Sequence, residues 1–175
     1  GIQPEVVRGY VLDCFNITRD FMRTYLEIEP QSQFDPEIWK FCMEEEKIYA
    51  PEAAYCFTLW RQISWTNNTA KKHIENSICS DCYSPLIKPI IPIKSDIEGM
   101  SFQCANCGKR WEYEDLLILA CKQEERRNYY DPHDCDISQF FECPECYMET
   151  YDAHENQCVN CGAKGPYTCD RCLKD

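Results

Sequence analysis

Apolar side chains recur at steps of three and four residues along the first part of the chain. Over residues 4–29 they share one helical face, while charged residues occupy the other positions. Pro4 suits the first turn of a helix, and Pro30 cannot continue one. The spacing therefore predicts a helix with an apolar stripe made of Val7, Tyr10, Val11, Cys14, Phe21 and Tyr25.

Two further helices are predicted before residue 77. Asp35 followed by Pro36 is a start signal, because a carboxylate caps free N–H groups and proline fits the first helical position. The short helix that follows ends near residue 48, and Pro51 is predicted to open a third helix running to about residue 76. Three helices with short connections predict a small bundle with an apolar core of its own, in which Cys14, Cys42 and Cys56 are buried free thiols.

The pattern changes after residue 77. β-branched and aromatic residues stand between prolines over residues 78–111, which indicates short strands. Leucines over residues 113–129 predict an amphipathic helix, and residues 130–138 form a turn-rich linker. Short strands are predicted at 139–142 and 149–152. The chain is therefore assigned to the α+β class.

The cysteines explain how such short strands can form a stable fold. Five Cys-x-x-Cys pairs lie in the last hundred residues, and such a turn lets two thiolates face one point about 2.3 Å from a zinc ion. Two pairs complete a tetrahedral site, and ligation then replaces a core that so short a segment cannot build. The sequence thus predicts two four-cysteine zinc ribbons, one with Cys79, Cys82, Cys104 and Cys107, the other with Cys143, Cys146, Cys158 and Cys161.

The last pair, Cys169 and Cys172, has no second pair beside it. His133 and Cys135 in the linker would complete a closed set of one imidazole and three thiolates, although His154 would serve as well. The other outcomes are a free dithiol, a disulfide, or ligands further along a longer chain. We therefore expect at least two zinc ions, with three as the higher count.

These segments predict a small N-terminal helical bundle followed by two zinc ribbons joined by an amphipathic helix. The predicted domains are 1–76 for the bundle, 77–138 for the first ribbon with its helix and linker, and 139–175 for the second ribbon with the terminal pair. Redox-active dithiols are disfavoured, because that chemistry needs a Cys-x-x-Cys pair at a helix start beside a βαβ unit. A zinc deaminase is excluded because His73 and Glu75 precede Cys79 too closely and no coordination position stays open for water.

The net charge of the chain limits the kinds of molecule that it can bind. The formal net charge is −12, and no third of the chain is net basic. Each four-thiolate zinc site adds a further two negative charges. Binding to a phosphate backbone is therefore disfavoured, and the candidate contacts are Lys109, Arg110, Trp111, Arg126 and Arg127. The odd number of cysteines, fifteen, and the absence of a membrane-length apolar run predict a reducing, cytoplasmic compartment without membrane insertion.

The order of parts resembles a group of bacterial zinc-ribbon proteins with an N-terminal helical region. The resemblance covers about the last hundred residues, in which Cys-Pro-x-Cys, Cys-x-x-Cys-Gly and Cys-x-x-Cys follow a first ribbon. It rests on the ten cysteines of the five Cys-x-x-Cys pairs together with Pro144 and Gly162. The resemblance implies a ribbon fold held by zinc and leaves the function open.

Two functions are compatible with these features. The first is a non-enzymatic interaction module in which structural zinc ribbons present a protein-binding surface, and no catalytic residue is assigned. Tyrosines around the second ribbon support it, since tyrosine is favoured at interfaces, although they equally suit a small aromatic core. These tyrosines are Tyr129, Tyr130, Tyr147, Tyr151 and Tyr167. The alternative function is that of a nucleic-acid-binding or nucleic-acid-processing accessory protein.

Overall fold

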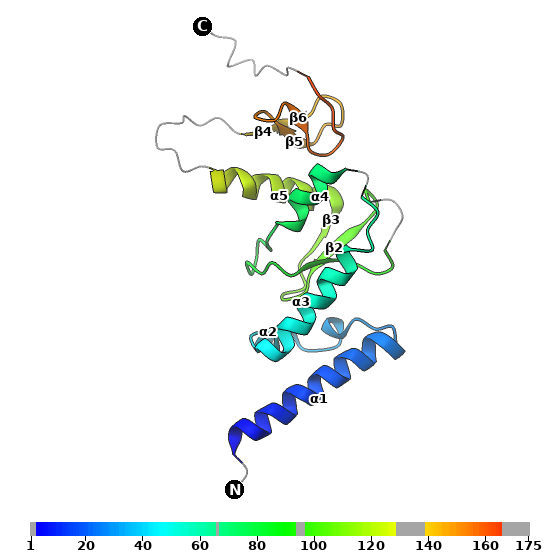
Figure 1. Ribbon diagram of the computed structural model, residues 1–175, viewed down its shortest axis with the longest axis vertical. Helices are drawn as coiled ribbons and strands as arrows, with labels where there is room; N and C mark the ends of the chain where they lie inside the picture. The colour runs from blue at the N-terminus through cyan, green and yellow to red at the C-terminus, as the bar shows by residue number, and fades with distance from the viewer. Residues whose placement is uncertain (1–2, 66, 94–96, 129–138, 166–175) are drawn as a thin grey trace.

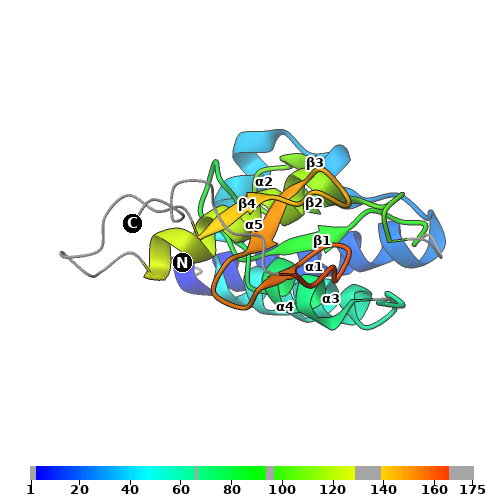
Figure 2. The ribbon, with the colours of Figure 1, turned by 90° about the horizontal axis from the view of Figure 1, so that it is seen from above.

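The computed structural model describes residues 3–65, 67–93, 97–128 and 139–165. It is an α+β protein with a helical region followed by two small antiparallel sheets. The elements succeed one another along the long axis of the molecule, with the first helix at one end and the second sheet near the other (Figure 1). Figure 2 looks along that axis, so the same layers project onto one another. None of the helices in the described part of the chain is long and apolar enough to cross a membrane.

The helical region contains four α-helices and one short 3₁₀ turn. The helices are α1 (Pro4–Tyr25), α2 (Pro36–Met43), α3 (Glu46–Trp60) and α4 (Asn68–Glu75), and the 3₁₀ turn spans Pro30–Ser32. The predicted start of α2 is confirmed, because the side chain of its capping residue accepts hydrogen bonds from the next two free N–H groups.

The third predicted helix is wrong in its bounds. Pro51 lies inside α3 rather than at its start, and the chain leaves the helix after Trp60. A new helix begins at α4, where the Asn67 side chain accepts hydrogen bonds from the N–H groups of Thr69 and Ala70, at 2.8 and 3.4 Å. Asn67 is a strong cap, and this local signal competes with continuous helix.

The first sheet contains β1 (Ile87–Pro89), β2 (Ser101–Cys104) and β3 (Arg110–Glu112), antiparallel and in that order. Its register pairs Phe102 with Trp111, and both side chains are buried. Pro89 stands on an edge strand, where its missing N–H group breaks no central ladder.

The helix α5 (Tyr113–Asn128) follows β3 directly and connects the two sheets. The second sheet contains β4 (Phe140–Glu142), β5 (Glu149–Asp152) and β6 (Gln157–Cys158), again antiparallel and in chain order. α5 contacts strands of both sheets and packs beside α4, as Figure 1 shows. The predicted joining helix and both short strands around Cys143 are therefore confirmed.

The helices do not have an apolar core of their own, contrary to the prediction. Trp39, Met43 and Ile48 pack in one cluster with Leu86 and Ala105 of the first cysteine-rich segment. The Trp39 indole N–H also donates to the carbonyl oxygen of Ala105 at 2.7 Å. The helices are too short to enclose a core alone, so they complete it against the metal-site loops.

A second apolar cluster continues through the rest of the molecule. It joins Trp60 and Ile74 of the helical region to Phe102 of the first sheet, to Phe140 of the second sheet and to Val159, which directly follows β6. The stacked rings of Trp60 and Phe102, with centroids 5.4 Å apart, lie near its centre. This packing crosses both predicted boundaries between domains, at residues 76 and 138.

The predicted apolar stripe of α1 is present but faces away from the rest of the described chain. The face that packs inward carries Leu12, Phe15 and Met22, with the buried Arg19 among them. Cys14, predicted to be buried, is exposed. The other two thiols follow the prediction more closely, since Cys56 is buried and Cys42 partly so.

Candidate metal centres

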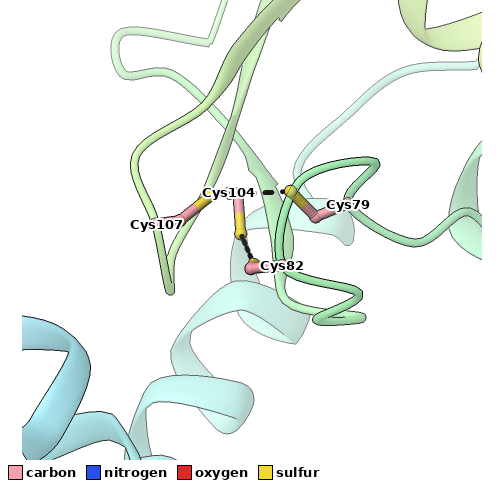
Figure 3. A group of neighbouring side chains, drawn as sticks. All are labelled: Cys79, Cys82, Cys104 and Cys107. Atoms are coloured by element: carbon pink, nitrogen blue, oxygen red, sulfur yellow. Dashed lines mark hydrogen bonds between the residues drawn. The ribbon is translucent and has the colours of Figure 1, made fainter.

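Each predicted four-cysteine set comes together in space. Site 1 contains Cys79, Cys82, Cys104 and Cys107, and site 2 contains Cys143, Cys146, Cys158 and Cys161. Within each set, all the sulfur atoms lie within 4.8 Å of one another. Figure 3 shows the side chains of site 1 converging on one point from two loops.

Both sites are built from loops with the same backbone hydrogen bonds. In each loop the carbonyl oxygen of the first cysteine accepts from the N–H four residues later, for example from Tyr83 to Cys79 at 3.0 Å. The first cysteine's own N–H donates to the carbonyl five residues later, as from Cys104 to Lys109 at 2.8 Å. The chain therefore folds back around each pair and turns both thiols to one side.

This fold-back requires a positive φ at the fourth residue after the first cysteine. Gly108 and Gly162 adopt it with φ of 81° and 75°, as their lack of a Cβ allows. Tyr83 and Tyr147 adopt it with φ of 58° and 59°, which is an uncommon conformation for a bulky residue. The two sites are thus a structural repeat, Cys-x-x-Cys-Tyr followed by Cys-x-x-Cys-Gly. The repeat was not predicted, although the tyrosine after the first pair of each site is a signal for it in the sequence.

The sulfur positions fit a tetrahedral zinc ion. The sulfur atoms lie 3.5 Å apart between Cys79 and Cys107 and 3.6 Å apart between Cys82 and Cys104 in site 1. In site 2 they lie 3.7 Å apart both between Cys143 and Cys161 and between Cys146 and Cys158. Four sulfurs about 2.3 Å from one zinc ion would lie about 3.8 Å apart. A disulfide would need about 2.05 Å, and all the cysteines in the described residues are free.

The electrostatics of the two sites also favour a cation. Burial raises the pKa of the Cys104 thiol, and it raises that of Cys107 to about 11 and that of Cys161 to about 12. Burial also opposes the thiolates of Cys82 and Cys158, but hydrogen bonds outweigh it and lower the pKa of both groups. Cys104, Cys107 and Cys161 would be neutral thiols near pH 7 if only other thiols faced them. A divalent ion at the centre supplies the charge that stabilises four thiolates in so small a volume. The donor set therefore matches structural zinc, which favours sulfur ligands.

Site 1 is anchored to the helical region. Within its own cysteine-rich segment, the N–H of Ala105 donates to the carbonyl of Leu86 at 2.7 Å. The carbonyl oxygens of Cys104 and Ala105 accept from side chains of the helical region, Gln31 at 3.2 Å and Trp39 at 2.7 Å. Partners of this kind orient a ligand loop before the metal binds.

Site 2 is anchored through Asn67. While its oxygen caps α4, its amide nitrogen donates to the carbonyls of Val159 and Asn160, at 2.6 and 2.8 Å. The Thr150 hydroxyl lies 3.4 Å from the Cys158 sulfur, and the Tyr113 hydroxyl donates to the Asn160 side chain at 3.1 Å. The sequence offered no signal for the role of Asn67 at site 2, because its partners lie more than ninety residues away.

The predicted third site lies outside the described residues. This applies to His133, Cys135, Cys169 and Cys172. His154, the other histidine that would serve at that site, is exposed in the turn after β5 and belongs to neither of the two cysteine clusters. The third zinc therefore stays a prediction.

The candidate nucleic-acid contacts do not form one surface feature in the described part of the chain. Trp111 is buried at 7% exposure, so its ring is closed to stacking with a base. Lys109 pairs with Asp81 at 3.5 Å, whereas Arg110 lines a separate cavity of about 590 Å³ beside β1. The side chains of Arg126 and Arg127 fall outside the description.

Comparison of the chain with protein-family models, with curated proteins and with solved structures found no match. The resemblance to bacterial zinc-ribbon proteins therefore stays a prediction from the motifs. The case for the two metal centres rests on their own geometry.

Replacing Tyr147 with glycine is expected to stabilise the protein. The tyrosine side chain is 77% exposed, and its left-handed backbone conformation costs about 1 kcal/mol that glycine does not incur. We expect Tyr147→Gly to raise the free energy of unfolding by about 0.5 kcal/mol or less in a denaturant titration, because the greater freedom of glycine in the unfolded chain offsets part of the relieved strain. Gly162→Ala, at the equivalent position of the partner loop, is the matched control and should lower it. A destabilised Tyr147→Gly protein would show that the ring makes contacts of its own.

Proposed function

We propose that the protein is a non-enzymatic interaction module in which two structural zinc ions hold the ribbons and the helical region as a platform for a protein partner. The observation that carries the proposal is the closed ligand set. Four cysteine sulfurs surround each centre, so a bound zinc ion has no open position for water or substrate. Catalytic zinc sites keep such a position open.

The way the two sites are anchored supports a role as a platform. Ribbon 1 (residues 78–112) and ribbon 2 (residues 139–165) share an apolar cluster, and hydrogen bonds from Gln31, Trp39 and Asn67 fasten their metal loops to the helical region. Binding of zinc therefore contributes free energy to more than the loops that hold it.

The surface supports binding to protein rather than to nucleic acid. Large apolar side chains are exposed on α1, and the aromatic rings of Tyr83 and Tyr147 stand 74% and 77% exposed at the two metal loops. Exposed apolar patches of this kind mark interaction sites. The net charge of −12 opposes binding to a phosphate backbone, which depends on clustered lysine and arginine.

The two candidate functions are separated by one pair of binding measurements. The zinc-loaded protein is titrated into fluorescent single-stranded DNA and RNA between 50 and about 200 mM salt, where phosphate contacts weaken steeply. In parallel, the same protein is used to capture partners from a nuclease-treated extract of its host. We expect no saturable oligonucleotide binding and a protein partner that survives nuclease. Tight binding that falls steeply with salt would instead establish the nucleic-acid alternative.

A further inference from the structure

The first helix carries an apolar face that no other part of the described chain covers. Figure 1 shows α1 at the end of the molecule opposite ribbon 2, with its inner side against α2 and α3 and nothing drawn on its outer side. The exposed fractions of the side chains on that outer side run from 46% for Val7 to 73% for Tyr25. This apolar strip runs along 22 helical residues, a length of about 33 Å. Isolated apolar residues are normal on a protein surface, whereas a continuous strip of this length marks an interaction site.

The outer face has the spacing of a two-helix seam. Its residues follow one another at alternating steps of four and three, which is the heptad pattern of helices that pack side by side. None of them is charged. The Thr18 hydroxyl is satisfied within the helix, because it donates to the carbonyl of Cys14 at 2.9 Å, and the second hydroxyl, that of Tyr25, stands at the end of the seam. We call these residues the α1 seam: Val7, Val11, Cys14, Thr18, Phe21 and Tyr25.

We propose that the α1 seam is a homodimer interface, on which α1 of a second copy packs antiparallel about a twofold axis between Cys14 and Thr18. The inference rests on the proposed function and names the partner of one surface of the module. In this register Val7 meets Tyr25 of the second copy, Val11 meets Phe21, and Cys14 meets Thr18.

The distribution of side-chain size along the seam is the reason for choosing a second copy. Within the seam, the N-terminal half carries the small residues Val7 and Val11, and the C-terminal half carries the aromatic rings of Phe21 and Tyr25, while the exposed Tyr10 stands beside the seam in the N-terminal half. A twofold axis across the helix places each small residue opposite a large one, which fills the interface evenly. A parallel pair would set ring against ring at one end and leave space at the other.

The arrangement of charge and of the rest of the fold is compatible with this pairing. Arg8, Arg19 and Arg23 are all engaged in ion pairs on or near the inner side of α1, so no cation must be buried in the seam. Ribbon 1 lies in the middle of the molecule, on the inner side of the helical region, and ribbon 2 lies near the opposite end, so a second copy can approach the outer face of α1 (Figure 1). Isologous contacts of this type are the commonest in soluble oligomers.

The first test is the mass of the zinc-loaded protein in solution. Sedimentation and light scattering of the full chain at micromolar to about 100 µM concentrations should give twice the chain mass of 20.7 kDa, with reversible dissociation on dilution. A monomer at every concentration would overturn the proposal. So would a dimer that persists when the seam is altered.

Paired charge variants test the register itself. Val11→Glu and Phe21→Lys should each be monomeric, because a homodimer of either would bury two unpaired charges. Mixed in equal amounts, the two variants should dimerise, since the new carboxylate then meets the new ammonium and the other pair stays Val11 with Phe21. Only the antiparallel register restores both pairs, so two variants that stay monomeric when mixed would refute it. Val11 is 61% exposed and Phe21 is 50% exposed in the single chain, so the substitutions should leave the fold intact.

Controls distinguish this proposal from the proposed function. Ile38→Glu and Phe57→Lys place the same charges at exposed apolar positions outside the seam, at 56% and 58% exposure, and should remain dimeric. Zinc content is measured on the same samples. A monomer that holds two zinc ions would refute the dimer and leave the interaction module standing, whereas a dimer without zinc would refute the structural role of the metal.

Discussion

Replacing Cys104 with alanine is expected to destabilise the helical region as well as ribbon 1. The substitution removes one of the four proposed zinc ligands, and structural zinc in small domains supplies about 10–16 kcal/mol of folding free energy, so we expect a loss of several kcal/mol. The loop of Cys104 also holds the hydrogen bonds to Gln31 and Trp39. We therefore expect the tryptophan fluorescence and the helical circular dichroism of the Cys104→Ala protein to be lost together, at a lower denaturant concentration than in the unaltered chain.

Cys121→Ala is the matched control for this experiment. Cys121 is also fully buried, but it lies in α5 and belongs to neither metal centre. Removing its thiol should cost about 1 kcal/mol, as an ordinary core substitution does. If Cys104→Ala and Cys121→Ala lowered stability equally, site 1 would have no metal-dependent role in folding.

The second large effect is expected at Glu52, whose side chain is fully buried in α3. Its two oxygens accept from both terminal nitrogens of Arg23 at 2.8 Å, and Lys88 of β1 lies 3.5 Å away. Arg23 and Lys88 in turn share Glu29, at 2.6 and 2.8 Å. Burial opposes the charged form of Glu29, yet these two cations lower the pKa of its carboxyl group. The network thus joins α1, α3 and the first sheet by charge.

We expect Glu52→Ala to lower the free energy of unfolding by about 3–5 kcal/mol, because two buried cations would then share one carboxylate. Equilibrium denaturation measures this directly. Glu46→Ala, an exposed acid at the start of the same helix, should change stability by no more than about 0.5 kcal/mol. A comparably small effect at Glu52 would mean that water or counterions compensate the buried charges.

The metal centres were predictable from the sequence because their information is local. A Cys-x-x-Cys turn specifies both its ligands and its backbone within six residues, and all eight cysteines of sites 1 and 2 were found in this way. The cap at Asp35 and the amphipathic α5 were predicted for the same reason. The periodicity of apolar residues also predicted correctly that they share one face of α1.

The errors concern what each face contacts. Periodicity cannot tell whether the partner of Val7 to Tyr25 lies in the same chain, and the structure leaves those residues outside while Leu12 and Phe15 pack inward. The break between α3 and α4 depends on Asn67, whose second set of partners in ribbon 2 is remote in sequence. The buried Glu52 was missed likewise, because its cations come from α1 and β1.

Native mass spectrometry of the protein purified without chelator tests the central claim, that two four-cysteine sets each hold a structural zinc ion. We expect at least two zinc ions per chain, one fewer in each of Cys104→Ala and Cys158→Ala, and two fewer when both are combined. A third ion that survives the double substitution would belong to the predicted site of His133, Cys135, Cys169 and Cys172. An unaltered chain that carries fewer than two zinc ions, or single variants that keep the full count, would show that the two cysteine sets are not structural zinc sites.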